Sequence, residues 1–305
     1  MRKISRASPD PFPRYFPDDR QMIVERLVIL GSKGGPSLRT TARMPTSNLL
    51  EVGGKVCVVD CGLGVTSRLV DAGIKLADID YIFITHLHSD HLLELGPLLH
   101  TAWTTNLNKR ITVFGPAGTT EYLDHFYQSL QFDIDLRIDD EGRPDLRELV
   151  QIKEYGQGLV LADTPRVTAL KVPHPPVEEC YALKMEHDGW KVTFGADTAY
   201  FAPLMEFAQG SDILIHEAML VSGIKELIGI TNSAKSLEKH LLASHTKVED
   251  VGRIAHGAGV ELLVLNHLVP VTPKGINEQE WLDEIAKAWK GKTVIARDGL
   301  EIRRQ

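Results

Sequence analysis

Short runs of β-branched and other apolar residues, separated by turn residues, fill the first part of the chain. Asn48–Val52 and Lys55–Asp60 flank Gly53-Gly54, and this pattern predicts a β-hairpin. Met22–Leu30 precedes the hairpin as a predicted strand, and Asp78–Thr85 follows it as a short apolar strand. We therefore expect mainly antiparallel β structure in this part of the chain.

A glycine-rich segment follows the first predicted strand. Its sequence, Gly31-Ser-Lys-Gly-Gly-Pro36, does not match the pattern G-x-x-x-x-G-K-[ST] of a phosphate-binding loop. We therefore interpret this segment as a turn.

Helical periodicity begins further along the chain. In Gly118–Leu130, apolar residues recur at the i, i+3, i+4 and i+7 spacing of one helix face. Leu92–Trp103 also has the character of an apolar helix, whereas the charged segment Ile138–Asp145 predicts a surface turn. Further strands are predicted at Lys109–Phe114, Val167–Val172, Cys180–Met185, Lys191–Phe194, Ile213–His216, Glu261–Leu265, Thr293–Arg297 and Leu300–Arg303. Further helices are predicted at Leu204–Gln209, Lys247–His256 and Glu278–Lys290.

The domain organisation follows from the absence of any shift in composition that would mark a linker. We expect one compact domain over residues 21–305. Residues 1–20 contain four prolines and no apolar run, so we expect an extended N-terminal arm there.

The charged residues give the chain an acidic balance, with 34 Lys and Arg against 41 Asp and Glu and a net charge of −7 at pH 7. Because tight binding to nucleic acid requires many cations facing the phosphates, this balance argues against a nucleic-acid partner. No apolar stretch approaches the roughly 20 residues that span a bilayer, so no membrane partner is expected. The three cysteines, Cys57, Cys61 and Cys180, cannot all pair, which favours a reducing cytoplasm.

Four potential metal ligands lie within six residues at the end of the predicted strand 78–85. They are His86, His88, Asp90 and His91. Residues i and i+2 of an extended chain face the same way, so His86 and His88 can converge on one metal ion. Asp90 and His91 can turn back toward a neighbouring ion. Imidazole and carboxylate ligands suit Zn²⁺, and Mn²⁺ or iron also accept them, so this segment predicts a metal site.

The spacing H-x-H-x-D-H after a strand resembles the signature of the metallo-β-lactamase superfamily, and the resemblance extends from about Leu27 to the C-terminus. Three later positions match further ligands of that family. His174 follows a predicted strand, Asp197 follows the segment Thr193-Phe-Gly-Ala, and His267 ends a late strand.

The resemblance implies a dinuclear site, a fold and a supporting residue. Two divalent ions, with Zn²⁺ expected, would each bind their own set of three ligands, and one aspartate would bind both ions. The sets are His86, His88 and His174; Asp90, His91 and His267; and the shared Asp197. The implied fold is an αββα sandwich, in which two facing mixed β-sheets carry helices on their outer sides. Asp60 resembles a family aspartate that steadies a ligand histidine.

Two segments, Ile213–Ala218 and Ser244-His-Thr246, resemble the ribonuclease Z-like branch of the superfamily. This resemblance implies that His245 donates a proton to the leaving group and that Glu217 supports His245. A carboxylate beside an imidazole fixes its tautomer and raises its pKa, as proton donation requires. Thr246-Lys-Val-Glu249 fits a capping box, which would hold His245 just before the first turn of a helix.

A charge count indicates the expected chemistry. Two divalent ions, two aspartates and a bridging hydroxide leave about one net positive charge, which suits a monoanionic ester or a developing oxyanion. We expect a hydrolysis in which the bridging hydroxide attacks, Asp90 orients it and His245 protonates the leaving alkoxide.

The substrate is less defined than the site. Ile111–Gly118 and Phe132–Gly142 resemble an arylsulfatase-like and phosphodiesterase-like subgroup, so a small sulfate ester or phosphodiester is the first expectation. A lactone or carboxylic ester is the alternative, because Met219–Ile230 can form an apolar lid or else an amphipathic helix covering the core. A ribonuclease Z that processes tRNA is the second alternative, although we find no long Gly/Pro-rich arm of the kind that grips tRNA. Related branches also favour a homodimer.

Overall fold

The computed structural model describes residues 25–38, 43–231, 236–272 and 275–304. The expected N-terminal arm, residues 1–20, lies outside the described residues. Within the described part, none of the helices has the length and apolarity needed to cross a bilayer.

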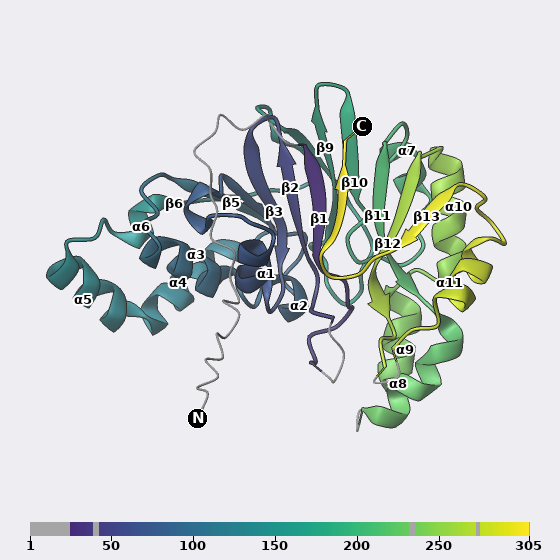
Figure 1. Ribbon diagram of the computed structural model, residues 1–305. Coiled ribbons are helices and arrows are strands. Elements are labelled where there is room, and N and C mark those ends of the chain that lie inside the picture. Colours follow the sequence, from purple (N-terminus) through teal and green to yellow (C-terminus); the bar gives the residue numbers. More distant parts are fainter. Residues whose placement is uncertain (1–24, 39–42, 232–235, 273–274, 305) are drawn as a thin grey trace, which may run out of the picture.

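Two seven-stranded mixed sheets form the centre of the molecule (Figure 1). In the first sheet, the order is β14 (Leu300–Arg303), β1 (Arg26–Gly31), β2 (Ser47–Val52), β3 (Lys55–Cys61), β4 (Tyr81–Phe83), β5 (Ile111–Gly115) and β6 (Val150–Glu154). In the second, it is β13 (Lys292–Ile295), β12 (Leu262–Val269), β11 (Ile213–Met219), β10 (Trp190–Phe194), β9 (Tyr181–His187), β8 (Arg166–Lys171) and β7 (Gly158–Leu161). Each sheet has an antiparallel half and a parallel half, and the parallel runs are β3 to β6 and β10 to β13.

Alternating side chains on the strands build two different apolar layers. In β1, Leu27 and Ile29 enter the core between the sheets, whereas Val28 and Leu30 pack on the outer side of the first sheet. This period of two is what a strand covered on both faces requires. The predicted hairpin is confirmed, because Val52 pairs with Lys55 across Gly53-Gly54.

Helices cover the outer face of each sheet and complete the αββα sandwich that the resemblance implied (Figure 1). The first sheet carries α1 (Val65–Asp71), α3 (Leu95–Thr104) and α4 (Thr119–Ser129), and the second carries α7 (Pro203–Phe207), α10 (Val248–Ala258) and α11 (Glu278–Ile285). Short helical segments join consecutive elements along the chain at η1 (Leu76–Asp78), α2 (Ser89–Leu92), α6 (Leu146–Leu149) and η2 (Val221–Gly223).

The charged turn predicted at Ile138–Asp145 is wrong in its first half, because α5 (Gln131–Glu141) continues through it. Ile134 is the one side chain of α5 that is buried, so the helix has no apolar stripe to reveal it in the sequence. Arg137 instead pairs with Asp133 and Glu141 one helical turn away on either side, which stabilises an exposed helix. Gly142 ends α5 at a φ of 67°.

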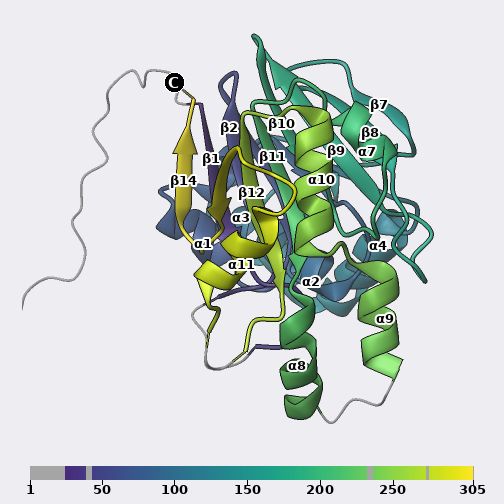
Figure 2. The ribbon, with the colours of Figure 1, turned by 90° about the vertical axis from the view of Figure 1, so that its right-hand side faces the viewer.

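A pair of helices, α8 (Ile224–Ile230) and α9 (Ser236–Ser244), extends beyond one end of the sandwich (Figures 1 and 2). Ile224 and Leu241 pack with Met219 and Val269 in a small apolar cluster of their own. The segment predicted as a lid or a core-covering helix therefore forms helix on a local core, next to the ends of β11 and β12.

Candidate metal centre

The predicted ligands lie where strands of both sheets end. In the second sheet β10, β11 and β12 are parallel, and β8 runs in the same sense because β9 is antiparallel to both β8 and β10. Carboxyl ends of strands that run in one direction meet at one edge of a sheet. His174 follows β8, Asp197 follows β10, and His267 lies two residues before the end of β12. All three therefore reach the His86–His91 segment that follows β4.

One group of ligand atoms consists of three imidazole nitrogens. His86 Nε2 and His174 Nε2 each lie 3.1 Å from His88 Nδ1. Asp197 Oδ2 lies 3.9 Å from both His86 Nε2 and His174 Nε2. A tetrahedral zinc site with bonds of about 2.0–2.1 Å has ligand atoms about 3.3 Å apart, so this spacing leaves room for one ion.

A second group shares the same Asp197 oxygen. His267 Nε2 lies 3.0 Å from Asp197 Oδ2 and 3.2 Å from Asp90 Oδ2. His91 Nε2 lies 3.4 Å from Asp197 Oδ2 and 3.7 Å from Asp90 Oδ2. All four residues are buried, and the two groups together contain all seven predicted ligands.

Without bound cations, burying these charged and titratable side chains together would destabilise the folded chain. Burial, followed by the neighbouring His174 ring, lowers the pKa of His88 to about 4, and burial with the His91 ring holds the pKa of His86 well below its ordinary value. Burial opposes charge on His267, yet the Asp197 carboxylate raises the pKa of that imidazole to about 10. The His86 and His88 rings are thus neutral and present lone pairs, whereas the carboxylates beside His267 favour a positive charge there, and this donor set fits divalent metal ions.

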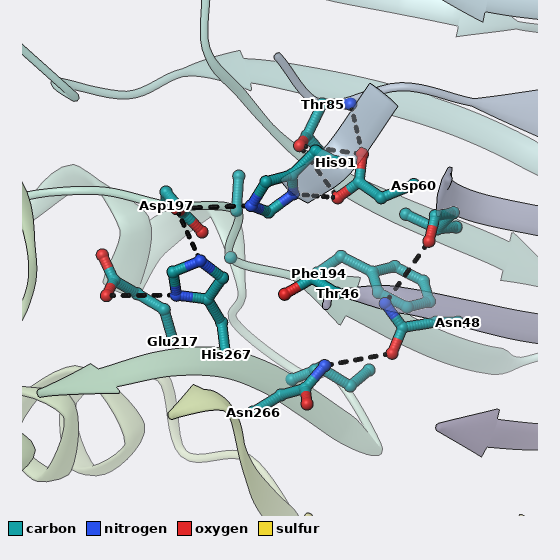
Figure 3. Close-up of a pocket in the computed structure, with 14 residues that line it drawn as sticks. Thr46, Asn48, Asp60, Thr85, His91, Phe194, Asp197, Glu217, Asn266 and His267 are labelled. Atoms are coloured by element: carbon teal, nitrogen blue, oxygen red, sulfur yellow. Dashed lines mark hydrogen bonds and ion pairs between the residues drawn. The ribbon is translucent and has the colours of Figure 1, made fainter. Parts of the chain in front are cut away.

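Contacts of the second ring nitrogen orient three of the predicted ligand histidines, His174, His91 and His86. His174 Nδ1 donates to the Ser244 carbonyl oxygen at 2.9 Å, so its Nε2 carries the lone pair. His91 Nδ1 lies 2.8 Å from Asp60 Oδ2, the contact predicted for Asp60 (Figure 3). Thr85 Oγ1 donates to Asp60 and lies 3.1 Å from His86 Nδ1. Asp60 therefore supports one ligand histidine directly and another through Thr85.

Replacing Asp60 with asparagine should weaken metal binding without removing a ligand. Asp60 has a φ of 63°, which asparagine tolerates, so the backbone should keep its shape. Loss of the carboxylate behind a ligand histidine typically reduces metal affinity about 10- to 100-fold. Titration of metal-free Asp60→Asn protein with Zn²⁺ against a competing chelator measures the change. If this variant bound Zn²⁺ with the affinity of the wild type, Asp60 would not support the metal site.

His245 lies beside the two ligand groups and is almost entirely buried. Its Nδ1 is 2.8 Å from Glu217 Oε2, and its ring centroid is 5.2 Å from that of His174 and 5.5 Å from that of His267. Burial opposes charge on His245, but Glu217 outweighs it and raises the pKa of the imidazole. Because the carboxylate occupies Nδ1, Nε2 is the nitrogen that can face a substrate.

The predicted capping box is wrong, although the predicted helix does begin there. Helix α10 starts at Val248, and no side chain caps its first turn. Thr246 Oγ1 donates instead to the Thr198 carbonyl oxygen at 2.6 Å, one residue after Asp197. Tertiary contact, and not a local cap, fixes the position of His245.

Two further residues reach the site without having been predicted. His240 on α9 has its ring centroid 6.5 Å from that of His174 and 6.2 Å from that of His245. Asn266 precedes His267 and donates to Asn48 Oδ1 at 3.1 Å, which joins the two sheets beneath the site (Figure 3). In the sequence, His240 lies four residues before Ser244, which is one helical turn. This spacing is the feature that could have placed His240 near the site.

Comparisons with known proteins identify the family and support the fold. The family described as "Beta-lactamase superfamily domain" matches residues 57–268. Ribonuclease Z of Mycobacterium marinum is 31% identical over 276 residues, covering 89% of this chain and 96% of that protein. Among solved structures, the metallo-β-lactamase fold protein YhfI from Bacillus subtilis has a TM-score of 0.69 at 21% identity, covering 92% of this chain and all of that one. The short form of human tRNase Z has a TM-score of 0.63 at 19% identity, covering 91% and 98%.

The chain belongs to the metallo-β-lactamase superfamily, as the sequence predicted. Within that superfamily it is a ribonuclease Z-like member. Two expectations are thereby confirmed: the chain is a metal-dependent hydrolase that acts on ester bonds, and its family implies divalent metal ions.

Proposed function

We propose that this chain hydrolyses phosphodiester bonds at a site holding two divalent metal ions, with zinc as the ion that the donor set suits best. The observation that carries this proposal is the shared position of Asp197 Oδ2. That single oxygen lies within 3.9 Å of ligand nitrogens from both groups, which places the two sites next to each other. Adjacent sites of this kind suit an in-line displacement at phosphorus.

When bound, two such ions lower the pKa of water and stabilise negative charge on phosphoryl oxygens. The chain itself supplies the remaining functions. Asp90, on the edge of the second group, accepts hydrogen bonds and can orient the attacking water. With its Nδ1 on Glu217, which holds the tautomer, His245 gives a proton from Nε2 to the departing oxygen.

RNA is the substrate class that the relatives favour. A protein named ribonuclease Z matches 89% of this chain at 31% identity, which counts against the expectation that nucleic acid is no partner. Small phosphodiesters are the substrate class that the net charge of −7 favours, because an acidic surface repels a polyanion. Sulfate esters and lactones stay untested predictions for the same site.

One preparation can separate these substrates. Zn²⁺- or Mn²⁺-loaded protein should cleave bis(p-nitrophenyl) phosphate, and we expect weaker or no turnover on a p-nitrophenyl sulfate and on a lactone panel. Faster turnover of either of those than of the diester would contradict the phosphodiester proposal. Elemental analysis of protein purified without chelator gives the native metal in the same experiment.

A tRNA precursor with a 3′ extension tests the RNA candidate. Specific cleavage at the 3′ side of the mature end, at physiological salt, would assign RNA as the substrate. Binding weaker than micromolar together with rapid diester turnover would assign a small substrate. A precursor truncated to its mature 3′ end is the matched control, because it keeps the body of the tRNA and lacks the bond to be cut.

A further inference from the structure

The glycine-rich segment after β1 lies against the second ligand group and has a contact with each of two predicted ligands. The backbone N–H of Gly35 donates to Asp90 Oδ2 at 2.8 Å. That oxygen is also the one 3.2 Å from His267 Nε2. A carboxylate oxygen has two lone-pair directions, so Oδ2 can accept this N–H and bind a metal ion at once.

Because Gly34 has no side chain, the His267 ring can pack directly against its backbone. A Cβ atom added to Gly34 would lie 2.8 Å from His267 Cε1, 2.9 Å from His267 Nδ1 and 2.5 Å from Val269 Cγ2. Side-chain carbon atoms do not approach other atoms so closely in proteins, so a larger residue at this position requires a shift of the segment itself or of the Val269 and His267 side chains against it. Gly34 itself has a φ outside the left-handed region, so the need for glycine here is space and not backbone shape.

The segment is fixed on the strand that carries His267. Gly34 N–H donates to Leu268 O at 3.1 Å, and Leu268 N–H donates to Ser32 O at 3.0 Å. Lys33 is buried, and its Nζ donates to the carbonyl oxygens of Gly34 and Gly35 at 3.0 and 2.6 Å. The two glycines are therefore held rigidly on both sides of the contact with the ligands.

We propose that Ser32–Gly35 is a positioning element of the second metal site. The backbone N–H of Gly35 holds the Asp90 carboxylate in place. Gly34 has no side chain, and the His267 ring packs directly against its backbone. The inference rests on the proposed function in that it requires a metal ion in the group of Asp90, His91, Asp197 and His267. The contacts of Gly35 and Gly34 are with Asp90, His267 and Val269, on the side of the second ligand group, so their effect should be selective for that group.

Gly34→Ala tests the inference through metal stoichiometry. We expect the wild type to bind two equivalents of Zn²⁺ and Gly34→Ala to bind one tightly, with affinity for the second reduced at least about 10-fold. Gly229→Ala is the matched control, because its added methyl group meets nothing within 4 Å, and it should bind two equivalents like the wild type. Thermal unfolding of the metal-free proteins shows whether each variant is folded.

A milder variant keeps the test decisive if Gly34→Ala does not fold. Lys33→Met keeps a long buried side chain but removes the donors to Gly34 and Gly35, so it should weaken the second equivalent by a smaller factor and leave the first unchanged. Two tight equivalents in both variants, or equal loss of both equivalents, would overturn the inference. A wild type that binds fewer than two equivalents would instead overturn the proposed function.

Discussion

Replacing Asp197 with asparagine will reduce metal binding at both sites and lower kcat/KM for a phosphodiester by more than about 100-fold. Asp197 Oδ2 lies near the ligand nitrogens of both groups, and removing its charge leaves four buried imidazoles around a site with one carboxylate fewer. The loss should exceed that of Asp60→Asn, because Asp197 is a predicted ligand and Asp60 only orients ligands. Elemental analysis and steady-state kinetics on the same sample measure both effects.

Asp139→Asn is the control for the change of charge, since Asp139 is exposed on α5 and far along the chain from every predicted ligand. It should keep both metal ions and full activity. An Asp197→Asn protein that retained two equivalents of metal at wild-type affinity would contradict the assignment of Asp197 as the shared ligand.

The strands of the sandwich could be predicted because a strand covered on both faces needs apolar residues at successive positions. Leu27, Val28, Ile29 and Leu30 are all apolar since β1 is covered by the second sheet on one side and by helices on the other. Helix α5 could not be predicted in this way. Ile134 is its one fully buried side chain, and the charged pairs along its exposed surface have the same composition as a polar turn.

The ligands were predictable because metal binding restricts residue type, whereas the neighbours that act through backbone groups were not. His174, Asp197 and His267 could be recognised by their order and their places at strand ends. Gly35 and Ser244 act through a backbone N–H and a backbone carbonyl oxygen, groups that every such residue has. Only the folded chain shows that these particular backbone groups face Asp90 and His174.

Glu217 connects the expected proton donor to the shared ligand. Its Oε2 contacts His245 Nδ1, and its Oε1 accepts the backbone N–H of Thr198 at 2.7 Å, the residue that follows Asp197. Thr246, which follows His245, donates to the carbonyl oxygen of the same Thr198. His245 is thus fixed relative to Asp197 from both sides, although it lies 48 positions further along the chain.

His245→Ala should remove proton donation while leaving both metal groups intact. General-acid catalysis typically contributes about 10²- to 10⁴-fold, and its contribution grows as the leaving group becomes more basic. We therefore expect kcat to fall by about 100-fold or more for a diester with an alkyl leaving group. For bis(p-nitrophenyl) phosphate, whose leaving group needs no proton, the loss should be several-fold at most.

His256→Ala provides the matched control, because His256 is an exposed histidine on α10, the helix that begins just after His245. It should match the wild type on both substrates. Equal losses on the two substrates in His245→Ala, with two equivalents of metal retained, would show that His245 shapes the site without giving up a proton. A steeper dependence of kcat on leaving-group pKa in the variant than in the wild type is the signature expected of a lost proton donor.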